Sequence, residues 1–445
     1  MTKAVVGKKA IGVSLPPMKV GIAGLGVVGA GVVRLLDRHA DMLAARIGRP
    51  VKVVAVSARD RRRKRDMPKG SWRWYAKAEE LAADPEVEVV VELIGGADGV
   101  ARRLVEAALK AGKGVVTANK AMLAMHGAKL AALAEKHDAP LAFEAAVAGG
   151  IPIVKALREG LAGNRIDSIT GILNGTCNYI LTEMRTTGRG FAEVLEEAQK
   201  LGYAEADPSF DIDGVDAAHK LAVLTSLAFN TAVDFRAVHV EGIRHVSALD
   251  ISFAREFGYR IKLLAIARRT PKGIEQRVHP CMVPADTPIA HVDGVFNAVA
   301  AEGDYVGPVL FEGRGAGSNP TASAVVADLA DLAAGRRAPA FGVPAVKLQP
   351  LKAAAMADHV GRFYIRLIVR DQPGVLADVS AVLRDHKISI ESLVQRGRAE
   401  GDRQPVAVVL ISHEAREADM ARALQRIAKL RSVLEPPALI RIEQL

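Results

Sequence analysis

Three glycines at fixed spacing constrain the fold of this chain more than any other feature. They are Gly24, Gly26 and Gly29, which satisfy the pattern G-x-G-x-x-G and follow a short apolar segment at Val20–Ala23. Apolar residues then recur at helical spacing over 32–36. In this order of strand, turn and helix, the first glycine permits a tight turn, the second lets backbone approach a pyrophosphate and the third lets the helix pack closely. The pattern predicts a dinucleotide-binding unit, and an ordinary glycine turn is the alternative.

The segments that follow alternate between apolar strands and amphipathic helices. We expect strands at Val51–Val56, Val87–Ile94 and Gly114–Thr117, and helices at Ala101–Ala111 and near Met122–His137. Strands that alternate with helices form parallel sheets, because the crossover helices cover both faces. The sequence therefore predicts an α/β fold with a doubly wound parallel sheet of the Rossmann type.

Changes in this alternation indicate further domains. An α+β domain is expected as an insertion, because the glycines at 313, 315 and 317 precede an apolar helix at Thr321–Ala334 that returns to the first domain. After a linker, a βαββαβ order indicates a small self-contained domain. The expected boundaries are a tail at 1–17, a dinucleotide-binding domain at 18–145 completed by about 312–345, the insertion at 146–311, a linker at 346–360 and a C-terminal domain at 361–445.

Composition excludes several classes of protein. Half of the 445 residues are hydrophobic and a quarter are charged, which is typical of folded globular chains. No apolar run approaches the ~18 residues of a membrane span, and residues 1–17 lack the apolar centre of a signal peptide. Cys177 and Cys281 are the only cysteines, too few for a disulfide framework, so we expect a reducing compartment and a cytoplasmic protein.

The end of the second expected strand bears on which dinucleotide binds. An NAD site usually places Asp or Glu there to bind the ribose 2′-hydroxyl. This strand instead leads into Ser57 and Arg59, which suit the 2′-phosphate of NADP. The basic run from Arg59 to Arg65 supplies part of the net charge of +10. It is either a nucleic-acid patch or a solvated loop beside the adenosine pocket, and we favour the loop because no nucleic-acid-binding module accompanies it.

Lysines and carboxylates also gather beside apolar or glycine-rich runs. Lys120 follows the expected strand that ends at Thr117, at the sheet edge where ligands of open α/β folds bind, although alone it would suit a solvated helix start. Asp216 and Lys220 are four residues apart and share a helix face. Their helix is apolar nearly all round, which indicates burial. A buried lysine must be paired or have its pKa lowered, and either state suits proton transfer.

With these residues in place, the sequence resembles the homoserine dehydrogenase family from Met18 to its end. The motifs that carry the resemblance are GLGVVG, VELIGG, TANK, FEAAVAGGIPI, GILNGTCNYIL, GYAEADPSFDIDGVDAAHKL and GRGAGSNPTASAVVADL. The resemblance implies reversible reduction of L-aspartate 4-semialdehyde to L-homoserine with NAD(P)H, on the route to threonine and methionine. It also implies that 146–311 is a substrate-binding and dimerisation domain, in a dimer or tetramer.

The resemblance assigns roles to individual residues. Lys220 matches the proton donor, Asp216 and Glu205 match substrate ligands, and Lys120 matches a lysine near the nicotinamide and the substrate. The residues expected at the cofactor are Gly24, Leu25, Gly26, Val27, Val28, Gly29, Ser57, Arg59, Lys120, Gly202, Glu205 and Gly317. The residues expected at a monovalent cation, with sodium as the expected ion, are Glu144, Val147, Gly149 and Ile151, mainly through backbone carbonyls.

The C-terminal domain resembles an ACT domain, which is a small-molecule regulatory module. Its turn at Asp371–Leu376 opens a helix whose N-terminus would receive an amino-acid carboxylate. Threonine is the effector that the resemblance implies. A domain that serves only dimerisation is the alternative.

Two other functions stay open from the residues. One is a nucleotide-sensing regulator of transcription, for which the chain lacks a helix-turn-helix candidate. The other is an NAD(P)-dependent oxidoreductase of a related semialdehyde that acylates a nucleophilic cysteine. Cys177 is the only cysteine near the expected pocket, and no histidine base accompanies it in a recognisable context.

Overall fold

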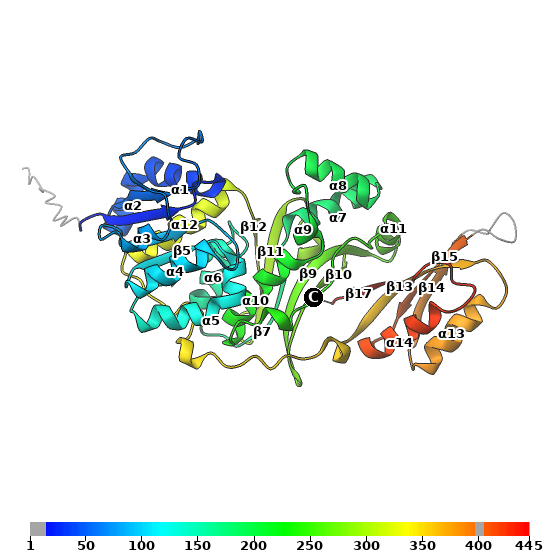
Figure 1. The fold of residues 1–445 in the computed structure, drawn as a ribbon. Coiled ribbons are helices and arrows are strands. Elements are labelled where there is room, and N and C mark those ends of the chain that lie inside the picture. Colours follow the sequence, from blue (N-terminus) through cyan, green and yellow to red (C-terminus); the bar gives the residue numbers. More distant parts are fainter. Residues whose placement is uncertain (1–14, 397–404, 445) are drawn as a thin grey trace, which may run out of the picture. The chain divides into compact units, whose positions relative to one another are not determined.

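The computed structural model describes residues 15–396 and 405–444. Within them the chain forms two compact units (Figure 1). Unit 1 comprises the described residues up to Asn119, Lys129–Ala145 and Gly317–Ala340. Unit 2 comprises Lys120–Ala128, Ala146–Ala316 and the described residues from Phe341 onward. Unit 1 is therefore built from three stretches of chain, and the last of them follows much of unit 2.

A parallel sheet of six strands forms the centre of unit 1, in the order β3-β2-β1-β4-β5-β6. The strands are β1 (Met18–Ala23), β2 (Val51–Ser57), β3 (Arg73–Tyr75), β4 (Val89–Glu92), β5 (Gly114–Thr117) and β6 (Leu141–Ala142). Ile22, Val91 and Val116 are fully buried, as strands covered on both faces require. The strand order reverses beside β1, which creates a topological switch point between β1 and β4. The predicted doubly wound parallel sheet is confirmed.

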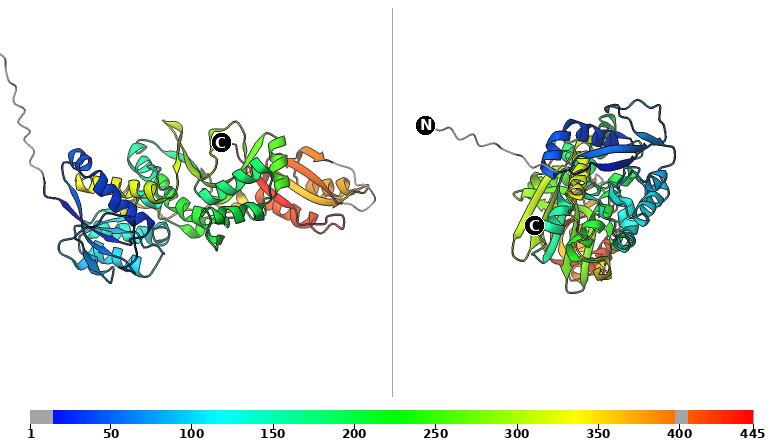
Figure 2. Two further views of the ribbon diagram at one scale, coloured as in Figure 1. Left: turned by 90° about the horizontal axis from the view of Figure 1, so that it is seen from above. Right: turned by 90° about the vertical axis from the view of Figure 1, so that its left-hand side faces the viewer.

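Helices flank this sheet. They are α1 (Val27–Arg38), α2 (Ala40–Ile47), α3 (Glu80–Ala83), α4 (Val100–Lys110), α12 (Ser318–Ala333) and the later part of α5 (Lys120–Lys136). α1 and α12 lie side by side although they are far apart in the sequence (Figures 1 and 2). Their close approach explains Gly31 in α1, because a Cβ at that position would lie 2.6 Å from the Ser318 hydroxyl oxygen.

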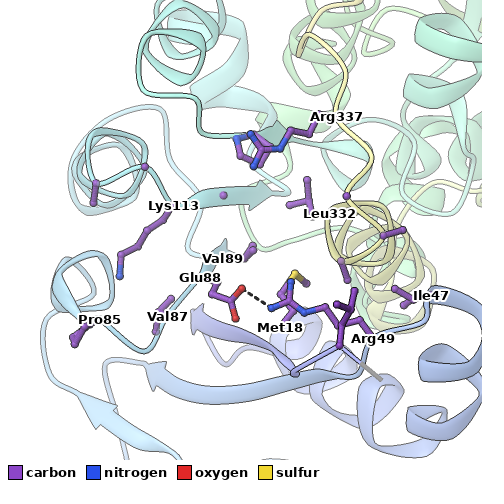
Figure 3. A pocket seen from close by; sticks show the side chains of 18 residues that line it. Met18, Ile47, Arg49, Pro85, Val87, Glu88, Val89, Lys113, Leu332 and Arg337 are labelled. Carbon is purple, nitrogen blue, oxygen red and sulfur yellow. Dashed lines mark hydrogen bonds and ion pairs between the residues drawn. The ribbon is translucent and has the colours of Figure 1, made fainter. Parts of the chain in front are cut away.

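A cavity of about 690 Å³ opens at the amino edge of the unit 1 sheet (Figure 3). Met18, Val89 and Gly114, the first residues of β1, β4 and β5, line it. Arg49 and Glu88 form an ion pair of 2.6 Å within its lining. Ligands of open α/β sheets bind at the opposite edge, outside the carboxyl ends of the strands. The glycine turn after β1 lies at that opposite edge, so this cavity is not the expected dinucleotide site.

Unit 2 contains a mixed sheet of eleven strands, nine of them in the order β12-β11-β7-β9-β10-β17-β13-β15-β14. These strands are β7 (Ile166–Ile172), β9 (Tyr259–Thr270), β10 (Gly273–Pro284), β11 (Phe296–Gly303), β12 (Gly307–Arg314), β13 (Val360–Arg370), β14 (Ile390–Gln395), β15 (Pro405–Ser412) and β17 (Ala438–Ile442). Two short strands, β8 (His239–Val240) and β16 (Ala415–Arg416), pair with β10 and β13.

The helices of unit 2 include one that is buried along almost its whole length. The helices are α6 (Ile153–Lys155), α7 (Gly175–Thr187), α8 (Phe191–Lys200), α9 (Ser209–Ile212), α10 (Val215–Phe229), α11 (Ala248–Glu256), α13 (Val375–Asp385) and α14 (Glu417–Ile427). α10 packs against β7, β9 and β10, and every residue from Asp216 to Phe229 is buried. The burial predicted from its apolar sequence is therefore confirmed.

The C-terminal segment has the predicted βαββαβ order, but the expectation that it is self-contained is wrong. Its last strand, β17, pairs antiparallel with β13 and parallel with β10. Ion pairs lie along the junction between β10 and β17, which we call the seam. Arg441 donates to Glu241 at 2.8 and 2.9 Å, and Arg277 is paired with Glu443. All four side chains are buried or half-buried. The sequence pattern could not reveal this pairing, since it joins residues more than a hundred positions apart.

In the described part of the chain, no helix combines the length and the apolar character that crossing a bilayer requires.

Candidate active site

The glycine turn of unit 1 has the geometry that its sequence predicts. Gly24 has φ +96°, and a Cβ there would lie 2.5 Å from the Leu93 carbonyl oxygen, so only glycine fits. A Cβ at Gly29 would lie 2.1 Å from the Gly24 carbonyl oxygen. The space beside Gly26 is open, immediately before α1 begins at Val27. The turn therefore offers a helix start with open space beside its backbone, which suits a pyrophosphate.

The basic loop after β2 folds over this turn. Arg65 donates its Nε hydrogen to the Leu25 carbonyl at 2.8 Å, and its guanidinium lies 5.5 Å from the centre of the Trp74 ring. Ser57 is buried at the end of β2, whereas Arg59 is exposed. Sequence reasoning did not single out Arg65 or Trp74. The only sequence signal for this contact was that tryptophans stand close to the arginine run. Arginine guanidinium groups often stack on tryptophan rings.

A buried carboxylate that sequence reasoning missed ties together the carboxyl ends of β4 and β5. Glu92 accepts hydrogen bonds from the backbone of Ile94 and Gly95 at 2.7 and 3.0 Å, and from the Thr117 hydroxyl at 2.6 Å. The Asn119 backbone N–H in turn donates to the Thr117 hydroxyl at 3.0 Å. This arrangement orders the chain immediately before Lys120.

Three predicted residues meet in unit 2. The Asp216 carboxylate accepts from the Lys220 ammonium at 2.7 Å through Oδ2 and from the Lys120 ammonium at 2.9 Å through Oδ1. Lys220 also donates to the Leu173 carbonyl at 2.7 Å. The Lys120 side chain is one-third exposed, whereas the Asp216 and Lys220 side chains are at most one-tenth exposed. Lys120 is thus no solvated helix start, because one carboxylate holds both ammonium groups.

Burial and charge shift the pKa values of this cluster in opposite directions. Burial lowers the pKa of Lys220 below its ordinary value, against the opposing charge of Asp216, and the nearby charge of Lys120 adds to the lowering. Burial alone would raise the pKa of Asp216, but the charges of Lys220 and Lys120 outweigh it and lower that pKa. Asp216 is therefore a fixed negative charge, and Lys220 is an amine whose proton is more easily released than usual.

Two further polar residues, Asn174 and Asp211, complete the cluster. Asn174 precedes α7, and its side-chain amide donates to Asp211 at 2.8 Å and to Asp216 at 2.9 Å. Burial and then the charge of Asp216 raise the pKa of Asp211. Sequence reasoning gave neither residue a role, although Asn174 and Asp211 lie in two of the motifs that carry the family resemblance and Asp211 stands in the same acidic segment as Asp216.

Other predicted residues are not brought into this cluster. Glu205 is exposed in the loop between α8 and α9, where its backbone carbonyl accepts from Gln199 at 3.0 Å. Gly202 has φ +75° in the same loop, and Gly317 belongs to unit 1 with φ +116° at the start of α12. Their roles therefore stay predictions.

The residues predicted for a cation fall in both units. Glu144 is buried in unit 1, and its backbone N–H donates to Asp328 at 2.8 Å. Val147 and Ile151 are buried in unit 2, on either side of Gly149, which has φ +39°. A carboxylate and backbone carbonyls are oxygen ligands, which hard cations prefer. The types of residue fit such an ion, and the site stays a prediction.

Cys177 does not have the environment of a nucleophile. It is fully buried in α7, and its thiol donates to the Asp211 carbonyl at 3.2 Å. Burial, followed by the charge of Asp211, raises its pKa well above the ordinary value. The thiolate that attacks a substrate is thereby disfavoured, which argues against the acylating alternative.

Comparisons with known proteins agree over nearly the whole chain. A family model described as homoserine dehydrogenase matches residues 152–330, its NAD-binding-domain counterpart matches 24–144, and an ACT-domain model matches 363–432. A homoserine dehydrogenase of Pseudomonas aeruginosa is 46% identical, with 97% of this chain and 100% of that protein covered. One of Neisseria gonorrhoeae is 45% identical, with the same coverage.

Solved structures give the same family. A homoserine dehydrogenase from Thiobacillus denitrificans superposes with a TM-score of 0.90 at 44% identity, and the match covers 96% of this chain and 98% of that one. A hyperthermophilic archaeal homoserine dehydrogenase in complex with NADPH superposes with a TM-score of 0.58 at 25% identity, over 71% of this chain and 97% of that one.

Proposed function

Because this chain belongs to the homoserine dehydrogenase family, we propose which of its residues carry out the reaction of that family. The chain is an NAD(P)-dependent oxidoreductase that acts on a CH–OH group, and its reaction is the reversible reduction of L-aspartate 4-semialdehyde to L-homoserine. The nicotinamide cofactor supplies or receives the hydride. The regulator and the cysteine-dependent oxidoreductase considered above are not supported.

The observation that carries the residue assignment is the cluster of Lys120, Asp216 and Lys220. As hydride reaches the aldehyde carbon, Lys220 donates a proton to the oxygen, and in the reverse direction its neutral amine takes the hydroxyl proton. The lowered pKa of Lys220 supports both roles, because an acid–base group works best when its pKa lies near the working pH. Asp216 orients the amine through the 2.7 Å bond, and the Leu173 carbonyl holds a second hydrogen of the ammonium group.

Lys120 and the carboxylates account for substrate binding. The substrate has an ammonium group and a carboxylate, so it needs both kinds of charge in the site. Asp216 and Glu205 bind the substrate, with Asp216 directed to its ammonium group. Lys120 adds positive charge where oxygen acquires negative charge in the transition state. Its one-third exposure in the described chain leaves it accessible to a ligand.

The cofactor is held by the glycine turn, and we propose NADP as the preferred form. Ser57, the last residue of β2, and Arg59, two residues later, recognise the 2′-phosphate, and neither position holds the Asp or Glu that favours NAD. The NADPH in the archaeal relative supports this preference. Arg65 and Trp74 hold the loop that carries Arg59 against the turn.

A monovalent cation, sodium, is the further bound group that we propose. Glu144 and the backbone carbonyls of Val147, Gly149 and Ile151 supply oxygen ligands. Backbone carbonyls are neutral oxygen ligands, so they would coordinate a hard cation without adding charge to the site.

The regulatory and cellular assignments complete the proposal. The ACT domain binds an amino-acid effector, threonine, at the start of α13, and the enzyme works as a dimer or tetramer in the cytoplasm. The turn before α13 supports the effector site, because Gly374 precedes the helix in a left-handed conformation with φ +94° and leaves the backbone N–H groups of the first turn available to a carboxylate.

The decisive experiment is reduction of NADP⁺ with L-homoserine as the sole substrate, repeated with NAD⁺. The proposal expects NADPH to accumulate, with a lower KM for NADP⁺ than for NAD⁺. No reduction of either coenzyme would overturn the function, and a lower KM for NAD⁺ would overturn only the coenzyme preference.

A further inference from the structure

One amide side chain joins three segments of the active-site cluster. Asn174 is buried at the start of α7, where its Oδ1 accepts from the Cys177 backbone N–H at 2.8 Å. Its Nδ2 donates one hydrogen bond of 2.8 Å to Asp211 Oδ1 in α9 and another of 2.9 Å to Asp216 Oδ2 in α10. Every polar atom of this side chain is thus used, and both hydrogens of the amide go to carboxylates.

The two carboxylates that Asn174 bridges are unequally supported. Asp216 is paired with two ammonium groups, from Lys120 and Lys220. Asp211 forms no ion pair within 4 Å among the described residues. Its other oxygen accepts from the Thr176 hydroxyl at 3.3 Å. Asp211 is half-buried and Asp216 is buried, and negative charges on two such close carboxylates repel each other. The amide donor between them offsets this repulsion and favours the ionised form of both.

Leu173, the residue before Asn174, binds Lys220, which is the ion-pair partner of Asp216. The Leu173 carbonyl accepts from the Lys220 ammonium at 2.7 Å, while Asn174 donates to the carboxylate oxygen that the same ammonium binds. The backbone at 173–174 therefore fixes both the amine and the acid. A displacement there would move the two together.

We propose that Asn174 is a positioning residue of the reaction, which sets the placement and ionisation of Asp211 and Asp216 and, through Asp216, the orientation of Lys220. The inference rests on the proposed function, because it concerns the same proton-transfer group. Asn174 itself need not touch the substrate.

The titratable groups around this amide determine what its loss would do. Cys177 faces it from α7, Asp211 from α9, and Asp216, His219 and Lys220 lie on α10, with Lys120 at the start of α5. Donation from Asn174 lowers the pKa of Asp211 against the raising effect of burial. Removing the donor therefore raises that pKa further, so Asp211 takes up a proton at a higher pH.

The experiment compares three variants in the full-length protein. Asn174→Ser keeps an oxygen that can cap α7 but removes the bridging amide. Asn174→Asp keeps the cap and the shape but replaces the donor with a third carboxylate. The matched control is Asn178→Ser, one helical turn later in α7, where a buried amide donates to the Val292 and Phe296 carbonyls at 3.0 and 3.1 Å and to no carboxylate.

We expect Asn174→Ser to lower kcat/KM for homoserine by roughly 10- to 100-fold, because small misplacements of reacting groups have effects of this size. The acidic limb of its pH profile reflects both the neutral amine of Lys220 and the ionised carboxylate of Asp211, and it moves to higher pH by roughly one unit, which corresponds to a tenfold change in the protonation equilibrium. Asn174→Asp moves the limb the same way, because added negative charge raises the pKa of Lys220 and homoserine oxidation needs the neutral amine. Asn178→Ser lowers the melting temperature but leaves the limb in place.

An Asn174→Ser profile that superposes on that of the parent enzyme, or on that of Asn178→Ser, would overturn the proposal. If the serine variant does not fold, the pH profile of Asn174→Asp is compared with the same two profiles, and superposition on either would overturn the proposal. Failure of the proposed function has a different signature, because the parent enzyme would then not oxidise homoserine at all.

Discussion

Replacing Lys220 with methionine separates the chemistry of the amine from its packing. Methionine has a similar length and no charge, so it fills most of the space in α10. The Asp216 carboxylate loses its 2.7 Å partner but keeps the Lys120 ammonium and the Asn174 amide, each at 2.9 Å. Because two of its three donors remain, we expect the unfolding free energy to fall by about 1–3 kcal/mol. Stripping a buried charge of all partners would cost more, about 3–5 kcal/mol.

The effect of Lys220→Met on turnover is expected to be far larger than its effect on stability. A positioned proton donor typically contributes 10²- to 10⁴-fold to the rate, so kcat for homoserine oxidation should fall by roughly that factor. The dissociation constant for NADPH should stay within about twofold, because Lys220 is not among the residues that we expect to hold the cofactor, and mutations at positions with no shared partners act independently. NADPH absorbance follows turnover, and quenching of protein fluorescence follows cofactor binding.

Lys262→Met is the matched control for this prediction. Lys262 is also buried, in β9, and donates to the Asp293 carboxylate at 2.9 Å and to the Val292 carbonyl at 2.6 Å. Asp293 keeps a second partner in Arg185 at 2.8 Å. We expect the control to lose stability and to keep kcat within a few-fold. A Lys220→Met enzyme with nearly normal kcat, or a control that is equally inactive, would refute the reasoning.

Three further predictions concern the coenzyme, the seam and the effector. Arg59→Ala should raise KM for NADP⁺ by roughly tenfold, since a bond between charged groups is lost, and leave KM for NAD⁺ unchanged; Arg62→Ala is the control, and equal changes for both coenzymes would count against Arg59. Glu241→Gln should destabilise the seam at neutral pH. Burial raises the pKa of Glu241, but its bonds to His239 and Arg441 lower it overall. The stabilisation is therefore present above the unfolded pKa of about 4.3 and is lost as pH falls, so unfolding midpoints of parent and variant should converge on acidification; a constant difference would contradict this. Threonine should lower the initial velocity of the parent enzyme, and unchanged velocity at saturating threonine would favour a purely structural ACT domain.

Local patterns allowed much of the fold to be predicted from the sequence. The glycine turn, β1 and α1 are adjacent in the chain, and the apolar character of α10 predicted its burial because a helix that is apolar nearly all round must be covered by other parts of the chain. The hairpin of β9 and β10 was not predicted, since both faces of these strands are buried and the usual alternation of polar and apolar residues is absent. β3, with only three residues, carries too little pattern to detect.

The active-site cluster was predictable only in part. The spacing of Asp216 and Lys220 reveals their pairing because both lie on one helix. The bond between Lys120 and Asp216 joins residues nearly a hundred positions apart, and local periodicity cannot show it. Asn174 and Asp211 were missed as partners for the same reason. Their roles depend on the start of α7 lying against α9 and α10 in unit 2. Local sequence patterns do not predict that contact, because it follows from the tertiary arrangement of the unit.

The most direct test of the proton-transfer assignment is a structure of the enzyme with NADP⁺ and L-homoserine bound. The account predicts that the substrate hydroxyl oxygen lies within about 3.2 Å of the Lys220 Nζ, the reach of a general base. A hydroxyl oxygen that instead bonds only to other groups, with Lys220 still directed at Asp216 and Leu173, would contradict it.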